Sequence, residues 1–420
     1  MKKRLCVSIY LLGVSLFVLF MPVQAQLNCS VPSGSYATIQ AAINDASCTT
    51  IIVSNGTFTE NLVINRDVTI IGQGAGLTVI DGGNTARSVE VQSGATVTLQ
   101  NLTVTNGNSG AANGGGIINN GTSLTLNRVT VSNSTGNIGG GVYNAAGTLN
   151  IQNSTISGNN ATLRGGGVGN DTGVVNITSS TLDNNVSATI GGGVFSLQGT
   201  VFVTNSTISN NQANRGGGLF NDLGSTTVTH STLTGNSASN SGGAVYNAHN
   251  NSLTISNSIL ANSVSGDDCG GGQTDSTVTT LGFNIVESIG RNCGFSAMAS
   301  DQVGVDPVLD GALASNGGPT QTFALLAGSP AIDAISAGQS GCTAGSSTDQ
   351  RGAVRAGGTN RGGSACDIGA YEANLSESPT AVSLTTFSVR PNPFPVSMLL
   401  VLFLTGVGQI VWQRRHKRYH

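Results

Sequence analysis

Four charged residues in the middle of the chain have the types and positions that could support acid–base chemistry. Asp171 and Asp222 each follow an Asn, and Arg164 and Arg215 each precede a run of Gly. A carboxylate can act as a general acid or base when the fold holds it close to a substrate. Neither Asp adjoins another acid, so these are weak catalytic candidates. Whether they could act in catalysis depends on the secondary-structure elements that position them.

Other residues with catalytic or metal-binding potential are scattered along the chain. The only adjacent acid pair is Asp267-Asp268, and no Cys-x-x-Cys or Cys/His spacing typical of zinc sites is present. Asp301, Asp306 and Asp310 could bind Ca²⁺, but isolated loop carboxylates are usually just solvated. The four His are separated in the sequence: His230, His249, His416 and His420. We therefore expect no metal and no cofactor.

A repeat of 25 or 26 residues organises the middle of the chain. Six triplets of small residues, Gly-Gly-Gly or Gly-Gly-Ala, are each followed by an aliphatic residue. The triplets begin at positions 114, 139, 165, 191, 216 and 242. About ten residues after each triplet, apolar and polar residues alternate, as in 148–152 and 200–204. This period of two predicts β-strands, and three apolar columns per repeat predict three short strands per turn. One turn cannot bury its apolar face alone, so the repeats are expected to stack into an all-β parallel solenoid.

The repeat also explains why the chain contains 60 Gly and many Asn. Each corner of a solenoid needs residues that tolerate a positive φ, which Gly and Asn do. An Asn repeated at one corner can form a hydrogen-bonded ladder of stacked amides. The alternative is a role in sugar binding or glycosylation, because many of these residues lie in Asn-X-Ser/Thr. The ladder is favoured because the repeat creates those triplets automatically. Two predicted ladders are Asn119, Asn144, Asn170, Asn221, Asn247 and Asn159, Asn185, Asn211, Asn236; a third comprises Asn153, Asn205 and Asn257, interrupted by Ser179 and His230.

The regular region spans residues 52–265, which corresponds to roughly eight turns. Before it, Ile39, Ala42 and Ile43 have helical spacing within 26–51. This stretch, followed by Thr50-Ile51-Ile52-Val53, resembles the start of pectin-lyase-like right-handed parallel β-helix proteins. The resemblance implies that residues 26–51 form an N-terminal cap with an amphipathic helix over the open first turn.

Residues 266–373 form a unit with a different sequence pattern. Four motifs occur in order: NGGPT at 316–320, LLAGSPAID at 325–333, DQRG at 349–352 and CDIGAYE at 366–372. Together they resemble the choice-of-anchor Q domain, found at the end of bacterial surface β-helix proteins. The resemblance implies display at a cell surface, and it supplies no catalytic residues.

Cysteine usage supports export from the cell. Cys6 lies in the N-terminal segment, and six Cys remain in the rest of the chain. They can pair in fifteen ways, of which nearest-neighbour pairing is one. That pairing joins Cys29 with Cys48, Cys269 with Cys293, and Cys342 with Cys366.

Both ends of the chain look like targeting and anchoring segments. Residues 1–25 combine a basic start, an apolar run and Val23-Gln24-Ala25, as in a secretory signal peptide. At the other end, residues 374–395 are rich in Ser, Thr and Pro and predict a stalk. An apolar stretch at 396–412 and a basic tail at 413–420 follow, which predict a membrane or sorting helix with a cytoplasmic end. Sorting machinery is a possible partner for this tail, and we leave open whether the tail is retained or cleaved.

The distribution of charge excludes one class of partner. Residues 26–390 contain no Lys, ten Arg and all twenty acids, which gives a net charge of about −10. Nucleic acids are bound largely through neutralisation of their phosphates by cations. We therefore expect no nucleic-acid partner.

These features favour a secreted, surface-anchored and non-enzymatic protein: an adhesin, a carbohydrate-binding protein or an envelope component, with glycans or other surface components as possible partners. The alternative is a polysaccharide lyase or glycoside hydrolase on the β-helix. By the resemblance, such lyases use Ca²⁺-binding carboxylates with a Lys or Arg base, and the hydrolases use clustered Asp residues. The body of this chain has no Lys, and Asp171 and Asp222 do not cluster.

Overall fold

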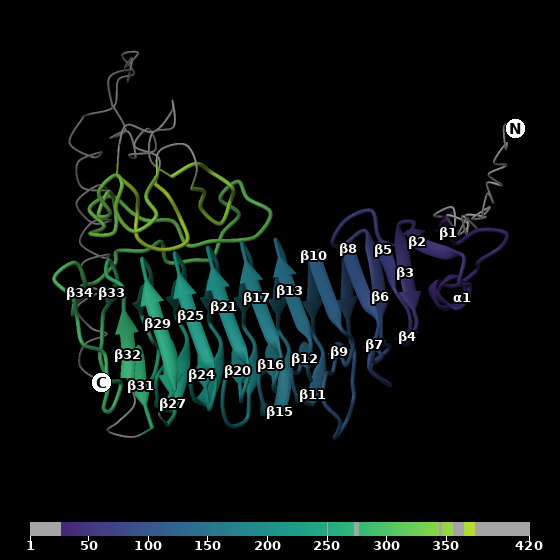
Figure 1. Ribbon diagram of the computed structural model, residues 1–420, viewed down its shortest axis with the longest axis horizontal. Coiled ribbons are helices and arrows are strands. Elements are labelled where there is room, and N and C mark those ends of the chain that lie inside the picture. Colours follow the sequence, from purple (N-terminus) through teal and green to yellow (C-terminus); the bar gives the residue numbers. More distant parts are fainter. Residues whose placement is uncertain (1–26, 250, 273–276, 344–346, 356–364, 374–420) are drawn as a thin grey trace, which may run out of the picture. The chain divides into compact units, whose positions relative to one another are not determined.

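The structure is a computed structural model in which residues 27–249, 251–272, 277–343, 347–355 and 365–373 are described. These residues form a parallel β-solenoid of about ten turns, built from three sheets that we call A, B and C (Figure 1). The predicted parallel β-solenoid is therefore confirmed. Its turns outnumber the eight expected, because irregular turns at both ends also pair with the regular ones.

Sheet A has 20 strands, arranged in two strips. Two longer strands, β8 (Thr96–Thr105) and β10 (Ser123–Ser132), run through both strips. The rest of the first strip comprises β1 (Leu27–Val31), β2 (Cys48–Val53), β5 (Val68–Ile71), β13 (Thr148–Gln152), β17 (Val174–Thr178), β21 (Thr200–Thr204), β25 (Ser225–Thr229), β29 (Ser252–Ser256) and β32 (Thr277–Thr280). The rest of the second comprises β3 (Gly56–Thr59), β6 (Thr78–Asp81), β14 (Thr155–Ser157), β18 (Thr181–Asp183), β22 (Thr207–Ser209), β26 (Thr232–Thr234), β30 (Ile259–Ala261), β33 (Ile285–Val286) and β34 (Gln302–Val303).

Sheets B and C complete each turn. Sheet B follows each Gly triplet and comprises β4 (Leu62–Ile64), β7 (Val89–Val91), β9 (Ile117–Asn119), β12 (Val142–Asn144), β16 (Val168–Asn170), β20 (Val194–Ser196), β24 (Leu219–Asn221), β28 (Val245–Asn247) and β31 (Cys269–Gly271). Sheet C precedes the triplets and comprises β11 (Thr135–Ile138), β15 (Asn160–Arg164), β19 (Val186–Ser187), β23 (Gln212–Arg215) and β27 (Ser237–Ser241). The strands are parallel to their neighbours, so equivalent residues of successive turns lie side by side.

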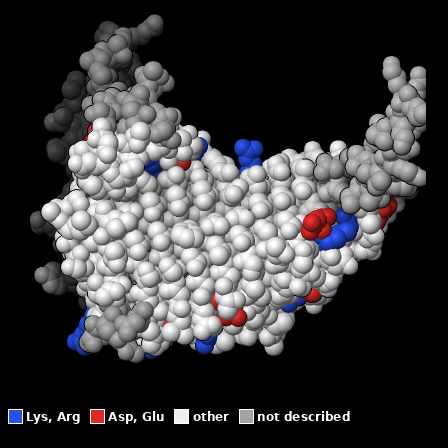
Figure 2. Space-filling view, in the orientation of Figure 1, with Lys and Arg blue, Asp and Glu red and all other residues white. Residues whose placement is uncertain are grey.

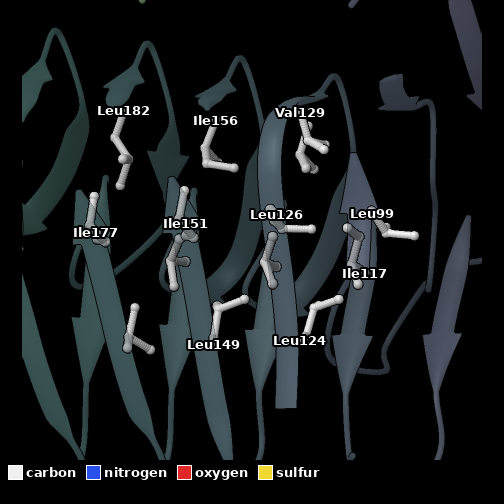
Figure 3. Close-up of a cluster of buried hydrophobic side chains, with 14 of the residues drawn as sticks. Leu99, Ile117, Leu124, Leu126, Val129, Leu149, Ile151, Ile156, Ile177 and Leu182 are labelled. Carbon is white, nitrogen blue, oxygen red and sulfur yellow. The ribbon is translucent and has the colours of Figure 1, made fainter. Parts of the chain in front are cut away.

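The core consists of apolar columns that run from turn to turn. Leu126, Ile151 and Ile177 occupy the same register in successive strands of sheet A, and each is fully buried. Figure 3 shows these side chains stacked in one layer, with Ile156 and Leu182 in a neighbouring layer. Alternate side chains of a strand point to opposite faces, so the polar residues between them face outward.

The Gly triplets are needed for two separate reasons. The first Gly of a triplet turns the chain, since Gly165 has a φ of 65°, which a residue with a side chain rarely adopts. The second Gly allows close approach between turns. A Cβ on Gly192 would lie 2.4 Å from the carbonyl oxygen of Gly217 and 2.6 Å from the backbone nitrogen of Gln212. The period of 25 or 26 residues in the Gly triplets therefore reflects close contacts between the backbones of neighbouring turns.

The two predicted Asn ladders are present inside the solenoid. In the first, the Asn119 amide donates to Asn144 Oδ1 at 2.7 Å, and Asn144 donates to Asn170 Oδ1 at 2.9 Å. This ladder then reaches Ser196 Oγ at 3.4 Å and resumes between Asn221 and Asn247 at 3.0 Å. The second ladder joins Asn159, Asn185, Asn211 and Asn236 through amide hydrogen bonds of 2.9–3.0 Å. All nine Asn side chains are buried, which is consistent with a structural role.

The third predicted column is not an amide ladder. Asn153, Asn205 and Asn257 have φ values between 46° and 51°, so they turn the chain between the two strips of sheet A. The ladder at this corner is made by the next residue along, a Ser. The Ser154 amide nitrogen donates to Ser180 Oγ at 3.1 Å, and the same contact recurs in the following turns. Within the predicted column, the Asn257 amide contacts His230 Nε2 at 2.9 Å. The Asn205 and Asn257 amides also donate to the carbonyl oxygens of Thr348 and Ser340 in the returning segment, so they do not form a continuous ladder.

The N-terminal end contains a short helix, α1 (Ile39–Asn44), whose apolar residues are buried against the core. Glu60 binds its first turn by accepting from the Ile39 and Gln40 nitrogens at 2.9 and 3.0 Å. At its other end, the Arg66 guanidinium donates to the carbonyl oxygens of residues 42, 43, 45 and 48. The helical cap expected over this end is not confirmed. The helix has six residues, and the outermost described strand of sheet A here is β1, which pairs with β2.

Parallel pairing continues beyond residue 265. Strands β31, β32 and β33 pair with β28, β29 and β30, and β34 pairs with β33. The chain then returns along the second strip of sheet A, where the loops coloured green to yellow in Figure 1 lie. Thr207 Oγ1 donates to Gln350 Oε1 at 2.6 Å, and the Ala370 nitrogen donates to Thr232 Oγ1 at 3.0 Å.

Charged residues of the DQRG and CDIGAYE motifs form a buried network in this segment. Arg355 is fully buried and lies 3.4 Å from a carboxylate oxygen of Glu372. Arg351 pairs with Asp349 at 2.7 Å and lies 3.7 Å from the centroid of the Tyr371 ring. Burial raises the pKa of Glu372 to about 7 and that of Asp367 to about 6. These motif residues thus hold the segment together.

The three predicted disulfides are confirmed. Cys29 bonds to Cys48, Cys269 to Cys293 and Cys342 to Cys366. Three disulfides indicate an extracellular protein, because such bonds persist in oxidising compartments. In the part of the chain that the structure describes, no helix is long and apolar enough to span a membrane. The predicted signal peptide (1–25), stalk (374–395), apolar helix (396–412) and basic tail (413–420) lie outside the described residues.

Candidate functional site

The outer face of sheet B carries a stack of aromatic rings. In each strand of this sheet the central residue points outward, because its two neighbours point into the solenoid. Phe195, Phe220 and Tyr246 share one register in β20, β24 and β28. Their ring centroids are 6.1 and 5.0 Å apart, and the Phe220 and Tyr246 rings are parallel to within 8°.

A groove of about 600 Å³ lies over the end of this stack, and we call it the sheet B groove. Phe220 and Tyr246 contribute its aromatic part. Its charged and titratable lining residues come from the loops and strand ends that flank sheet B: Arg215, Asp222, His249, Asp267 and Arg291. A concave site with a few convergent polar groups beside aromatic rings is the usual form of a ligand site. This is our candidate functional site.

An Asp–His pair is the best-defined polar contact in the groove. The Asp222 carboxylate lies 2.8 Å from His249 Nδ1, and the two residues come from successive turns. The His249 side chain is 52% exposed and that of Asp222 is 17% exposed, so the pair faces solvent. When a neutral His donates from Nδ1 to a carboxylate, its other ring nitrogen is the acceptor form. The contact with Asp222 therefore fixes the orientation of the imidazole at the groove.

Arg215 lies on the opposite side of β24 from Asp222. It ends β23, just before the Gly triplet, and its guanidinium carbon lies 5.9 Å from the centroid of the Tyr246 ring. A guanidinium group over an aromatic face is attracted by the negative face of the ring. The structure thus brings two of the four predicted site residues, Arg215 and Asp222, into one groove.

The other two predicted site residues lie two turns away along the same face. Arg164 is held over the Phe195 ring, with 5.3 Å between its guanidinium carbon and the ring centroid. Asp171 accepts a hydrogen bond of 3.4 Å from the Tyr143 hydroxyl. Burial and the nearby Asp171 charge raise the pKa of Tyr143, so this phenol is a hydrogen-bond donor at neutral pH. Neither Arg164 nor Asp171 lines the sheet B groove.

The sequence did not point to His249, Tyr246, Asp267 or Arg291 as site residues. His249 and Asp222 are 27 positions apart, and only the stacking of turns brings them together. A partial signal exists for His249, since it comes two residues after the ladder Asn247 and Asp222 comes one residue after the ladder Asn221. His230, which we expected at a corner, is not in the groove. Burial lowers its pKa to about 3, so it is neutral at physiological pH.

The described residues contain no group of three or more His, Cys, Asp or Glu side chains placed to hold a metal ion. Asp301, one of the possible Ca²⁺ ligands, instead binds protein groups. Its carboxylate accepts from Thr280 Oγ1 at 2.8 Å and from the backbone nitrogen of Asn284 at 2.9 Å.

No protein-family model matches the sequence, and none of the curated proteins compared with it matches. Among solved structures, the chain is similar in fold to a pectate lyase, Pel9A, with a TM-score of 0.48 and 15% sequence identity. That similarity covers 84% of this chain and 98% of the lyase. A pectin methylesterase from carrot is also similar, with a TM-score of 0.33 and 12% identity over 66% of this chain and 88% of the esterase.

Proposed function

We propose that this protein is an extracellular, non-enzymatic saccharide-binding β-solenoid and that the sheet B groove is its binding site. One observation carries the proposal: Arg215 and the Asp222–His249 pair converge on a groove whose aromatic part is Phe220 and Tyr246. A sugar ring has hydroxyl groups at its edge and C–H groups on its faces. The edge can hydrogen-bond to carboxylate, imidazole and guanidinium groups. Phe220 and Tyr246, which are 4% and 5% exposed, form the apolar floor of the groove below these groups.

Two other classes of ligand fit the groove less well. A peptide could bind by adding a strand, but β24 and β28 already have partners on both sides. A nucleic acid would need many cations, and the body of the chain carries about ten more acids than Arg and no Lys. On the face seen in Figure 2, charged side chains are few and lie mainly near its margins.

The proposal places the protein at a cell surface, as an adhesin or an envelope component. The disulfides support an extracellular location. The order of the motifs at 316–372 supports attachment through a choice-of-anchor Q-like segment, and the predicted helix at 396–412 would provide the membrane or sorting signal. Glycans and sorting machinery are then the partners to expect.

A glycan array probed with the full chain, purified in a mild detergent, tests the proposal. We expect specific binding to at least one saccharide, followed by measurement of its Kd by calorimetry. Arg215→Ala and Asp222→Ala should each weaken that binding about tenfold or more, since each removes a charged hydrogen-bonding group. Arg128→Ala and Asp310→Ala change residues of the same types outside the groove and should leave the Kd unchanged. An array without any bound saccharide would overturn the proposal.

A second candidate is a glycoside hydrolase or polysaccharide lyase. It is favoured by one observation, that two carboxylates, Asp222 and Asp267, line the same groove. Glycoside hydrolases use two carboxylates on either side of the scissile bond. The saccharides that bind on the array should be incubated with the full chain and assayed for reducing ends and unsaturated products. Turnover that Asp222→Asn or Asp267→Asn abolishes would establish this candidate over the non-enzymatic one.

A further inference from the structure

We infer that the outer face of sheet B binds a linear polysaccharide whose repeat is two sugar rings, and specifically an extended β-1,4-linked chain. This rests on the proposed function and adds the class of ligand. The evidence is that charged and uncharged turns alternate on this face, so the charge pattern repeats every two turns whereas the fold repeats every turn.

The alternation is visible in the eight residues that cross each turn of this face. Two turns carry Arg at the first position and Asp at the eighth, Arg164–Asp171 and Arg215–Asp222, and we call them the charged turns. The turns before, between and after them carry no charge at these positions: Ile138–Ala145, Ile190–Leu197 and Ser241–Ala248. Charged and uncharged turns therefore alternate over five successive turns.

The two charged turns share contacts in three dimensions as well as a sequence pattern. Each Arg lies over the aromatic ring of the next turn, Arg164 over Phe195 at 5.3 Å and Arg215 over Tyr246 at 5.9 Å. Each Asp lies across the strand from its Arg, because β16 and β24 separate them. Each Asp also binds a side chain of an adjacent turn, Asp171 with Tyr143 and Asp222 with His249. A group bound in one charged turn would find an Arg and an Asp in the other, although Phe220 lies between them in one turn and Gly169 in the other.

The uncharged turns supply a different surface. Ile138, Ile190 and Leu197 are half-buried and pack against the aromatic cluster of Phe195, Phe220 and Tyr246. A ligand that lies along the solenoid therefore contacts polar and apolar surface alternately. Strands in a sheet are about 4.8 Å apart, so the charged turns are about 9.6 Å apart.

An extended β-1,4-linked chain of six-membered sugar rings matches this pattern. Each ring is flipped relative to the one before, so every second ring presents the same edge to the same side. Two rings of such a chain span a length comparable to two strand spacings. Every second ring can then place its polar edge between an Arg and an Asp, while the ring between rests on apolar side chains. An α-1,4-linked glucan coils and does not keep this register with a flat sheet.

The test compares chito-oligosaccharides, which are β-1,4-linked, with malto-oligosaccharides, which are α-1,4-linked, each from two to six rings. Binding to the full chain is measured by calorimetry. The charged turns are two rings apart, so a disaccharide reaches one of them, whereas a trisaccharide or tetrasaccharide reaches both. We therefore expect affinity for the chito-series to rise about tenfold or more between two and four rings, with no such step in the malto-series.

The double variant Arg164→Ile and Asp171→Leu separates this inference from a general loss of structure. It gives one charged turn the residues that the chain already has at 190 and 197, so the fold should tolerate it. We expect it to abolish the step between two and four rings and to leave disaccharide affinity unchanged. Arg128→Asn with Asp310→Leu is the control outside sheet B, because Asn tolerates the positive φ of 56° at position 128, and it should keep the step.

Two outcomes would overturn the inference while the proposed function stands. One is a step that persists in the Arg164→Ile and Asp171→Leu variant. The other is a saccharide that binds on the array while the chito-series does not bind or binds no better than the malto-series. A protein that binds no saccharide at all would remove the proposed function and this inference together.

Discussion

The side-chain amide of Asn185 donates to Asn211 Oδ1 at 2.9 Å, and both side chains are shielded from solvent. The same oxygen accepts from the backbone nitrogen of Asn185 at 2.9 Å, and the Asn185 amide also donates to the carbonyl oxygen of Ile156 at 2.8 Å. Each Asn of this ladder therefore satisfies backbone groups at a corner where the strands end. The ladder is part of the hydrogen bonding of the solenoid.

Asn185→Ala should lower the free energy of unfolding by at least about 2 kcal/mol, because it leaves the buried donors of Asn159 and the carbonyl of Ile156 without their partners. Asn150→Ala is the control, since Asn150 makes similar amide contacts on the outward, half-buried face of sheet A. Its loss should be below about 1 kcal/mol. Urea denaturation followed by circular dichroism measures both. Equal losses would contradict a structural role that is specific to the interior ladder.

Gly192→Ala should destabilise the protein by about 3 kcal/mol or more. The added Cβ would lie 2.4–2.6 Å from backbone atoms of Gly217 and Gln212, and those backbones cannot move without separating two turns. Gly311→Ala is the matched control, because nothing lies within 4 Å of the added Cβ there. Thermal melts of the two variants should differ clearly. A Gly192→Ala variant as stable as Gly311→Ala would show that the turns are not held at this spacing.

The stability of the C-terminal segment should fall as the pH rises from about 4 to about 7. Burial raises the pKa of Asp367 to about 6 and of Glu372 to about 7, so the folded protein holds protons that the unfolded chain releases. The stabilising contribution of these two groups is complete below their ordinary pKa values and is lost as the pH passes about 6 and about 7. Arg355, Asp349 and Arg351 surround them in the same network.

Glu372→Gln tests this dependence, because Gln resembles the protonated carboxyl and does not titrate. The change in urea midpoint between pH 5 and pH 8 should be smaller in the variant than in the original protein. Asp310→Asn, in an exposed loop, should leave that change unaltered. A variant with the full pH dependence would exclude Glu372 as its source.

Removing the Cys269–Cys293 disulfide with a double Ser variant should destabilise the protein by about 3 kcal/mol, because the bond closes a loop with a sequence separation of 24. It should also weaken saccharide binding, since Arg291 and Asn292 of the groove precede Cys293 directly. The Cys29 and Cys48 double Ser variant removes a bond at the N-terminal end and should affect stability only. Melting temperature and Kd separate the two effects. Equal Kd changes in both variants would indicate that Cys269–Cys293 has no particular role at the groove.

Much of the fold was predictable because a solenoid is defined by contacts between equivalent positions. The period of 25 or 26 residues predicted the strands of sheets A and B, and the Asn columns predicted two interior ladders. The Ser ladder was missed, because Ser154 and Ser180 follow the more conspicuous corner residues Asn153 and Ser179, and Ser is common throughout the repeat. The length of α1 and the pairing of β1 with β2 depend on contacts outside the repeat, which its period does not describe.

The candidate site was predictable only in part. Arg215 and Asp222 could be selected because charged residues are few in the repeat. Asp267 and Arg291 lie beyond the last Gly triplet, close in sequence to the two cysteines of the Cys269–Cys293 disulfide, and both line the groove. Their positions depend on segments without a sequence repeat, so the period of the solenoid could not predict them.

The sequence by itself determined the stacking of turns, since each apolar column, Gly triplet and ladder Asn has a partner at a fixed spacing. It also determined which turns carry charge. Only the tertiary structure decided that Asp222 contacts His249 and that Arg215 lies over Tyr246. It also decided that the segment with the DQRG and CDIGAYE motifs packs on the second strip of sheet A. The physical reason is that periodic contacts repeat in the sequence itself, whereas contacts between side chains of different turns depend on where corners and loops direct them.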